Sequence, residues 1–431
     1  MSFLSEYPWW ILLLAGIGVL AILTAIVSLF FKLGDRPSRI WSDELAAVDS
    51  DGFLRPIAAL LGAPVRRGGT LELINNGDAW VTALLADVSA ARHSVTFSVY
   101  IWEPGEMSDQ IFEALAERAR AGVEVRVLLD GLGCMRCPEE GIKCLEEAGG
   151  RVAQFRPAHL GKLMRFHQRN HRRAIVIDGV VGYTGGIAVG DKWLGDARDP
   201  GEWRDTMVRI TGCPVESVQS AFTELWAYVS GEVLTGEAFF PQYQDGDSSI
   251  RSVGLVSSPA PEEHPLGLLL FMTFLASRKR LWITTPYFVP DEHTLGVIKR
   301  QARTGVDVRL LLPNEHIDAR LIRRASQRYY EQLMDAGVRI YEYQTTMMHT
   351  KHIVVDGKFS IIGSANLDIR SRELNHENVI GVLDPEFAGT LESTFEKDLE
   401  QSLQIDPVQW KQRSPGARIL EYVLAFFNKQ F

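Results

Sequence analysis

The sequence is short of basic residues. Its 45 lysines and arginines are outnumbered by 54 aspartates and glutamates, which leaves a formal net charge of −9 and a pI near 5.7. A nucleic-acid-binding protein usually carries a broad basic face. The charge balance therefore counts against a nucleic-acid partner, although it leaves room for a small basic pocket around a phosphate.

Cysteine is scarce too, with four in 431 residues. Three of them read C-x2-C-x6-C at Cys134, Cys137 and Cys144, and Cys213 lies apart. A zinc site would need a second close pair of cysteines or histidines, which is missing. We therefore expect separate packed or loop thiols, with a metal or redox role for the cluster as the alternative.

Charge is missing altogether from the 23 residues between Trp9 and Phe31. A helix of this length can cross the roughly 30 Å hydrocarbon core of a bilayer. No lysine or arginine precedes it, and the apolar run is longer than that of a cleaved signal peptide. We expect a retained transmembrane helix. Lys32, Arg36 and Arg39 follow it, so the positive-inside rule predicts that the remainder of the chain lies in the cytoplasm.

The rest of the chain contains an internal repeat. "AGVEVRVLLD" (121–130) and "TGVDVRLLLP" (304–313) match almost position for position, and each follows a strand pattern and an amphipathic helix pattern. A strand, a helix, a glycine turn and a second strand make a βαβ unit with parallel strands. The sequence therefore predicts an α/β fold built from a duplicated module.

Composition and turn signals divide the chain further. We expect a short tail (1–8), a transmembrane helix (9–31), a connector (32–68), a first α/β domain (69–230), a linker (231–255), a second α/β domain (256–405) and an amphipathic C-terminal segment (406–431). A helix docked on the core and a helix on the membrane surface both fit the last segment.

One phrase occurs twice, as "NHRRAIVIDG" (170–179) and "MHTKHIVVDG" (348–357). Residues two apart on a strand share a face, so His171 points the same way as Arg173, and His349 the same way as Lys351. An imidazole can attack phosphorus or donate a proton, and the neighbouring cation can neutralise phosphate oxygens. Two copies at one cleft would perform phosphoryl transfer without a metal or another cofactor.

The residues around the second phrase support this chemistry. "GSANLD" (363–368) supplies Ser364 and Asn366, whose side chains can donate to phosphate oxygens. Glu377 is a candidate to orient the imidazole of the same half, His349. His352 falls on the opposite face of the strand and is expected to be a core or surface residue.

The first phrase has a different environment. In "TGGIAVGD" (184–191) the backbone amides of Gly185 and Gly186 are expected to bind the anion, and Ala188 stands where Asn366 stands in the other half. Asp205 is expected to orient His171. His167 and His171 have the spacing of metal ligands on a helix, but their segment is predicted to be a loop, so no metal is expected there.

These patterns together resemble the phospholipase D superfamily, whose motif is H-x-K-x4-D: the second copy matches it fully and is followed by G-S-x-N, and the first has arginine in place of the lysine. The resemblance spans roughly residues 70 to 405. "YFVPD" (287–291) and "GSANLDIRSRELNHE" (363–377) are most similar to its bacterial cardiolipin synthase branch. It implies a pseudo-twofold pair of domains with one active site between them, in an enzyme of the bacterial inner membrane with its catalytic domains in the cytoplasm.

The resemblance also implies a mechanism. His171 is expected to form a phosphohistidine, and His349 to act as acid and base, while two phosphatidylglycerols become cardiolipin and glycerol. The exchange of these two roles stays open as the alternative. The resemblance carries over Lys351, Ser364 and Asn366 as phosphate ligands and Glu377 and Asp205 as imidazole partners. With the residues argued from the sequence itself, the expected catalytic set is His171, Arg173, Asp178, Asp205, His349, Lys351, Asp356 and Glu377, and the expected phosphate ligands are Ser364, Asn366, Gly185 and Gly186. Asp178 and Asp356 have a structural alternative, in which they accept bonds where each strand meets its turn.

The chain departs from the family pattern in its first half. Arg173 replaces the usual lysine, and Ala188 replaces an asparagine. Arginine keeps the cation but is bulkier and planar. Changed donor preference, a hydrolytic phospholipase D, a nuclease of the same superfamily and an inactive lipid-binding relative therefore stay open as alternatives.

Overall fold

The computed structural model describes residues 8–11, 13–19, 22, 45–157, 167–243, 249–259 and 265–413. The chain divides into two units, one made of 1–41 with 260–263 and one made of 42–259 with 264–431. In the described part of the chain, no helix has the length and apolar character that a membrane crossing requires. Most of the expected span 9–31, and the C-terminal segment beyond residue 413, lie outside the described residues.

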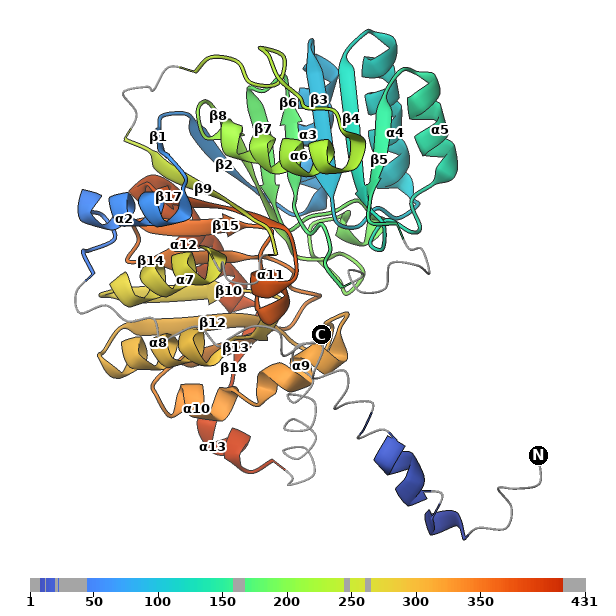
Figure 1. Ribbon diagram of the computed structural model, residues 1–431. Coiled ribbons are helices and arrows are strands. Elements are labelled where there is room, and N and C mark those ends of the chain that lie inside the picture. The colour runs from blue at the N-terminus through green and yellow to red at the C-terminus, as the bar shows by residue number, and fades with distance from the viewer. Residues whose placement is uncertain are drawn as a thin grey trace. The chain divides into compact units, whose positions relative to one another are not determined.

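The first half of the second unit is built on a seven-stranded sheet in the order β2-β8-β7-β6-β3-β4-β5 (Figure 1). Its strands are β2 (Thr70–Asn75), β3 (Ser94–Val99), β4 (Glu124–Asp130), β5 (Arg151–Phe155), β6 (Ala174–Ile177), β7 (Val181–Gly185) and β8 (Thr206–Thr211). Its helices are α3 (Gly77–Ala90), α4 (Glu106–Arg120), α5 (Glu139–Glu147), α6 (Val215–Ser230) and the short η3 (Asp191–Trp193).

The second half is built on a nine-stranded sheet in the order β1-β9-β17-β15-β14-β10-β12-β13-β18. Its strands are β1 (Val65–Arg67), β9 (Arg251–Ser257), β10 (Arg280–Thr284), β12 (Asp307–Pro313), β13 (Arg339–Tyr343), β14 (His352–Val355), β15 (Phe359–Gly363), β17 (Glu377–Leu383) and β18 (Ser402–Gln404). β11 (Phe288–Val289) and β16 (Leu367–Asp368) form a separate pair. The helices are α2 (Asp51–Leu61), α7 (Pro265–Ala276), α8 (Glu292–Arg303), α9 (Arg320–Gln327), α10 (Tyr330–Met334), α11 (Ile369–Glu373), α12 (Pro385–Glu400) and α13 (Pro407–Lys411).

The two sheets repeat one another, which confirms the predicted duplication. Seven consecutive strands of the second sheet, from β9 to β13, have the same order as the whole first sheet, and β1 and β18 add one strand at each edge. The expected parallel βαβ units are present as β3–β4–β5 and β10–β12–β13. The other neighbouring strands of the two sheets pair antiparallel, and tight turns join β6 to β7 and β14 to β15.

Each of those tight turns carries the Asp-Gly that closes the doubled phrase. Asp178 and Gly179 have φ of 51° and 67°, and Asp356 and Gly357 have φ of 55° and 65°. Left-handed conformations at two successive residues suit a tight hairpin, and Asp-Gly is a favoured pair for them. The phrase is therefore a strand followed by a reversal, as its pattern predicted.

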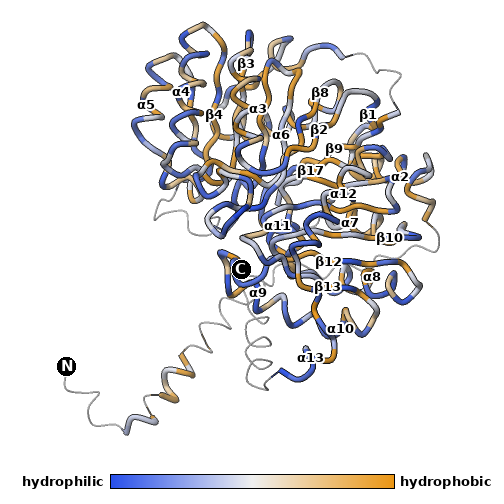
Figure 2. The backbone as a smooth tube through the Cα atoms, turned by 180° about the vertical axis from the view of Figure 1, so that it is seen from behind, coloured by the Kyte–Doolittle hydropathy of each residue, from blue (hydrophilic) through white to orange (hydrophobic). Residues whose placement is uncertain are grey.

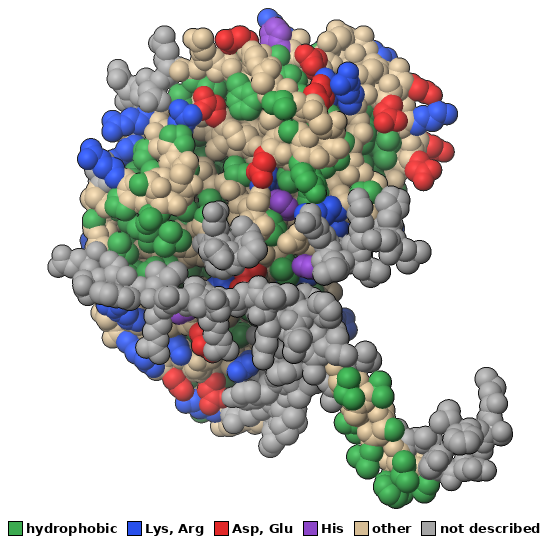
Figure 3. All heavy atoms as spheres, viewed as in Figure 1, with side chains coloured by type: hydrophobic (Ala, Val, Ile, Leu, Met, Phe, Trp, Pro, Cys, Tyr) green, Lys and Arg blue, Asp and Glu red, His purple; other side chains and the backbone are tan. Residues whose placement is uncertain are grey.

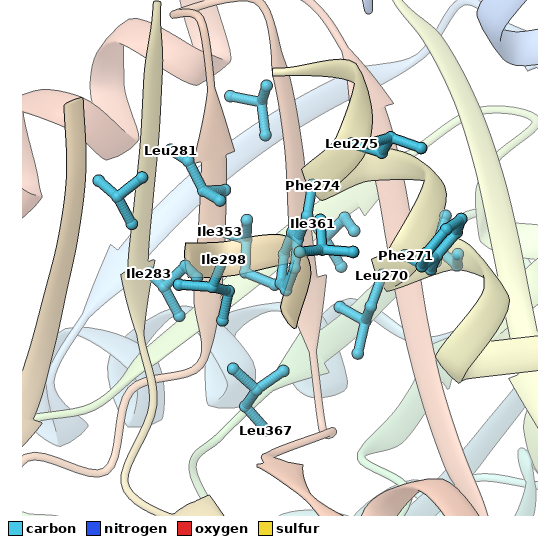
Figure 4. Packing of buried hydrophobic residues seen from close by; sticks show 14 of the residues in the cluster. Leu270, Phe271, Phe274, Leu275, Leu281, Ile283, Ile298, Ile353, Ile361 and Leu367 are labelled. Atoms are coloured by element: carbon cyan, nitrogen blue, oxygen red, sulfur yellow. The ribbon is translucent and has the colours of Figure 1, made fainter. Parts of the chain in front are cut away.

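The hydrophobic core lies on both sides of each sheet. One cluster between the halves brings α6 residues such as Phe222 and Trp226 together with Phe387 and Leu391 of α12. On the other side of the second sheet, Phe274 of α7 packs with side chains from β10, α8, β14 and β15 (Figure 4). The hydropathy colouring shows the same pattern, since β3 and β4 are largely orange (Figure 2). On the face seen in Figure 3, charged side chains of both signs are interspersed.

Candidate active site

The two halves of the second unit meet where the doubled phrases begin. His171 lies three residues before β6, and His349 three residues before β14. His171 is 6% exposed and His349 is 4% exposed, so both imidazoles are enclosed by protein. The structure thus brings the two predicted histidines to equivalent positions, each at the entrance of its strand.

Each imidazole is paired with a carboxylate from the opposite half. Nδ1 of His171 lies 3.0 Å from both carboxylate oxygens of Glu377, and Nδ1 of His349 lies 2.6 Å from Oδ2 of Asp205. The expectation that Glu377 serves His349 and Asp205 serves His171 is therefore wrong, because the pairing is crossed. An ionised carboxylate can only accept, so each Nδ1 carries the proton and each Nε2 keeps its lone pair.

Backbone contacts between the halves explain the crossing. Asn170 and His376 form an isolated parallel β-bridge, and so do Arg204 and Met348. These residues directly precede the two imidazoles and the two carboxylates. Because the bridged segments run side by side, the residues that follow each bridge also lie next to each other. His171 therefore meets Glu377, and His349 meets Asp205.

The two predicted cations make the same contact in both halves. Nη1 of Arg173 donates to the carbonyl oxygen of His171 at 2.7 Å, and Nζ of Lys351 donates to the carbonyl oxygen of His349 at 2.6 Å. Arginine therefore keeps the lysine's position. Nε and Nη2 of Arg173 are buried and have no hydrogen-bond partner within the described ranges, so two donors of a rigid fork are available to an anion.

Burial dominates the titration of the site. Together with Arg173 it lowers the pKa of His171 to about 4, although Glu377 opposes this change. Together with Lys351 it lowers the pKa of His349 to about 3, against the effect of Asp205. Burial also lowers the pKa of Lys351 to about 7. Both imidazoles are therefore neutral at neutral pH before an anionic ligand binds.

Both carboxylates stay ionised in this setting. Burial acts to raise the pKa of Asp205, but His349 and Lys351 outweigh it and lower that pKa. The same balance applies to Glu377, where His171 outweighs burial. At neutral pH the site thus holds two neutral imidazoles, two carboxylates, the Arg173 guanidinium and Lys351, whose pKa is about 7.

Ser364 and Asn366 differ in their hydrogen bonding at the site. The hydroxyl of Ser364 donates to Oε2 of Glu377 at 2.5 Å. In this state the serine orients the carboxylate and does not offer its proton to a phosphate. Asn366 is 6% exposed and lines a small cavity together with Lys351, and its Oδ1 lacks a hydrogen-bond partner among the described residues.

Gly185 and Gly186 lie so close to Thr206 and Asp205 that a larger side chain would not fit. The amide of Gly186 donates to the carbonyl oxygen of Thr206 at 2.9 Å, so the expectation that it binds an anion is wrong. A Cβ at Gly186 would lie 2.1 Å from Oδ1 of Asp205, and one at Gly185 would lie 2.4 Å from the Thr206 carbonyl oxygen. The glycines leave room for the carboxylate that orients His349.

Asp178 and Asp356 do not reach the imidazoles. The carboxylate of Asp178 accepts from the backbone amides of residues 92–94, and that of Asp356 accepts from those of residues 278–280. Each stands at the far end of its strand from the histidine and fastens the turn to the neighbouring strand. This placement corrects their inclusion among the catalytic residues and supports the structural alternative.

The structure adds residues that sequence patterns did not reveal. Nε1 of Trp193 donates to Oδ2 of Asp205 at 3.0 Å, and the Trp193 ring lies 5.7 Å from the His349 ring. Asn378 accepts from the amide of Arg173 and donates to its carbonyl oxygen, at 3.0 and 2.9 Å. Trp193 gave no signal, but Asn378 directly follows Glu377 and could have been noticed there.

His352 and the cysteines lie apart from this chemistry. Nε2 of His352 lies 3.2 Å from the Thr284 hydroxyl, inside the core, as predicted. Cys134, Cys137 and Cys213 are buried and Cys144 is exposed, and all four are free thiols, which fits the expected separate thiols. In the described part of the chain, no group of three or more metal-binding side chains comes together.

Two curated bacterial proteins are similar to this chain over most of its length. A cardiolipin synthase 1 from Bacillus anthracis is 33% identical, over 84% of this chain and 72% of the relative. A cardiolipin synthase from Geobacillus kaustophilus is 34% identical, over 90% of this chain and 78% of the relative.

Solved structures support the fold. The phosphatidylserine synthase of Haemophilus influenzae Rd KW20 superposes with a TM-score of 0.66 at 13% identity, over 88% of this chain and 98% of that one. The family model "Cardiolipin synthase, PLD-like domain" matches residues 84–199 and 271–399, which contain one half-site each. The chain therefore belongs to the phospholipase D-like cardiolipin synthase family of phosphatidyltransferases.

Proposed function

We propose that this protein makes cardiolipin from two molecules of phosphatidylglycerol through a phosphohistidine on His171. The observation that carries the proposal is the crossed pair of imidazole–carboxylate contacts beside two buried cations. The names of the curated relatives suggest the substrate class, and the contacts of each imidazole support a role for it in phosphoryl transfer.

The first half-reaction forms a bond between His171 and phosphorus. Glu377 holds the Nδ1 proton, so the Nε2 lone pair is free to attack. The bond from phosphorus to the glycerol oxygen breaks, and His349 gives the leaving oxygen a proton from its Nε2. The free donors of Arg173, together with Lys351 and Asn366, would hold the phosphate oxygens as charge moves.

The proton on Nε2 of His349 depends on the bound substrate. Lys351 is the charge that most opposes protonation of this imidazole. A phosphodiester between Lys351 and Arg173 brings a negative charge that offsets both cations, so we expect it to raise the pKa of His349. The acid is then charged only when there is a leaving group to protonate.

The second half-reaction reverses the roles. The terminal hydroxyl of a second phosphatidylglycerol gives its proton to Nε2 of His349 and attacks phosphorus. The phosphorus–nitrogen bond breaks, and His171 is restored. Water in place of the hydroxyl would give phosphatidic acid, as in a phospholipase D.

Incubating the detergent-solubilised enzyme with phosphatidylglycerol tests this function. We expect cardiolipin and glycerol in equal amounts, and a phosphatidyl adduct on His171 when the wild-type reaction is stopped within the first turnover by an alkaline denaturant, because phosphohistidine is stable in base. Phosphatidic acid without cardiolipin would replace the synthase assignment by a hydrolase. An adduct on His349 would exchange the two roles.

We further propose that residues 9–31 hold the enzyme in the bacterial inner membrane as a single span, with the domains 69–230 and 256–405 on the cytoplasmic side. The uncharged stretch and the basic residues that follow it support this arrangement. Resistance of the full chain to alkaline carbonate extraction is expected, and release by carbonate would contradict it.

A further inference from the structure

Beyond the two motifs, one buried ion pair joins the halves beside the Asp205–His349 pair. Nε and Nη2 of Arg204 donate to the two carboxylate oxygens of Asp398, at 2.9 and 3.0 Å. Arg204 is 4% exposed and Asp398 is 6% exposed. A two-pronged contact of this kind fixes orientation as well as distance. Arg204 belongs to the first half, and Asp398 to helix α12 of the second.

Arg204 touches both members of the pair through its backbone and side chain. Its carbonyl oxygen accepts from the amide of His349 at 2.8 Å, and its own amide donates to the carbonyl oxygen of Met347 at 3.0 Å. Its Nη1 donates to the carbonyl oxygen of Asp205 at 2.7 Å. Arg204, which Asp398 holds, is therefore hydrogen-bonded to the backbone of Asp205 and to the backbone of His349.

Helix α12 completes this connection. Through Arg204, Asp398 thus links the segment that carries Asp205 to α12. This helix packs against β14, the strand that follows His349. Among the described residues, the equivalent position of the other half-site forms no such ion pair: it is His376, whose Nδ1 lies 3.0 Å from the Ser258 hydroxyl.

We propose that Asp398 is a positioning residue that acts through Arg204 to hold Asp205 against His349. It touches no reacting atom. Its loss is expected to let the two halves shift locally, so that the 2.6 Å contact between Asp205 and His349 lengthens. Small displacements of an acid–base group can lower a rate by up to about 100-fold. The proposal rests on the proposed function for its kinetic test.

Asp398→Asn keeps the shape and removes the charge. We expect kcat for cardiolipin formation to fall about tenfold, with KM changed less than twofold. In an Asp205→Asn background the same substitution should have no further effect on kcat, because the contact it maintains is already gone. A purely structural role would lower the amount of folded enzyme and would not cancel in this way.

Asp87→Asn is the matched control. Asp87 accepts the same two-pronged contact from Arg209 of β8, at 2.7 and 2.9 Å. Arg209 lies four residues after Asp205, and both partners belong to the first half. We expect it to leave kcat of the folded enzyme within twofold. If Asp398→Asn does not fold, Arg204→Lys keeps the charge but loses the fork, and a tenfold fall in kcat is again expected.

An NMR measurement that needs no catalysis tests the positioning role of Asp398 independently of cardiolipin synthesis. In protein labelled with ¹⁵N-histidine, the Nδ1 proton of His349 should resonate far downfield, and Asp398→Asn should move it upfield while Asp87→Asn leaves it in place. An unchanged resonance together with an unchanged kcat would overturn the proposal. A shifted resonance in an enzyme that makes no cardiolipin would overturn the proposed function alone.

Discussion

At the residue scale, Arg173 is the substitution in the first half that lies nearest to the proposed chemistry of His171. The sequence marks it as a departure from the family pattern, yet its contact to the His171 carbonyl oxygen copies that of Lys351 to His349. Position and charge are kept, and the planar group adds two buried donors that no described residue uses. The substitution is therefore compatible with an active enzyme.

Two substitutions of Arg173 distinguish the effect of its positive charge from that of its planar group with several donors. Arg173→Lys keeps the cation and the carbonyl contact but not the second donor, so we expect kcat/KM to fall about 10-fold. Arg173→Met loses the charge beside the phosphate, and a loss of about 100- to 1,000-fold is expected, similar to removing a transition-state donor elsewhere. Initial rates of cardiolipin formation from labelled phosphatidylglycerol measure both.

The matched control for this pair is an arginine of the same chain outside the site. Arg300 is exposed on α8, and Arg300→Met should leave kcat/KM within twofold. If Arg173→Met behaved like Arg300→Met, the guanidinium would have no part in holding the phosphate.

At the element scale, the fold could be predicted from the sequence, but the crossed pairing could not. The repeat of "AGVEVRVLLD" and "TGVDVRLLLP" predicts two βαβ modules, and strand periodicity places each cation on the same face as its histidine. Spacing along one chain does not say which half a carboxylate faces. The bridges at Asn170 and Arg204 are non-local contacts, so Asp205 and Glu377 were placed in the right site but on the wrong histidines.

The aspartates of the doubled phrase also belong to the element scale. Asp356 accepts from three successive backbone amides at the start of β10, so Asp356→Ala leaves those donors without their partner. We expect a loss of about 1–3 kcal/mol in the free energy of unfolding. Because Asp356 lies at the far end of its strand from His349, kcat of the folded enzyme should change less than twofold. Urea unfolding and initial rates measure the two quantities.

Glu113→Ala is the control for that prediction, since Glu113 is exposed on α4 and accepts no such set of amides. Its free energy of unfolding should change by no more than about 0.5 kcal/mol. A large fall in kcat for Asp356→Ala at unchanged stability would return this residue to the catalytic set.

At the scale of the whole molecule, the active site exists only where the halves meet. Each imidazole takes its carboxylate from the other half, and Asn378 of the second half bonds the backbone of Arg173 in the first. Neither half holds a complete dyad by itself. One consequence is that the buried, neutral histidines at this boundary contribute to the stability of the whole fold.

Acid should also destabilise the protein through a histidine buried inside the second half, His352. Burial lowers the pKa of His352 to about 3, against about 6.5 in an unfolded chain. Below pH 6.5 the unfolded state binds a proton that the folded state does not, so this contribution is present above pH 6.5 and is lost as the pH falls toward 3. His352→Gln cannot titrate. Between pH 7.5 and 4.5 its unfolding temperature in detergent should fall less steeply than that of the wild type, because all other groups titrate in both proteins and cancel in the difference. Thermal unfolding at intervals of half a pH unit measures this, and parallel curves would show that His352 is protonated equally in both states.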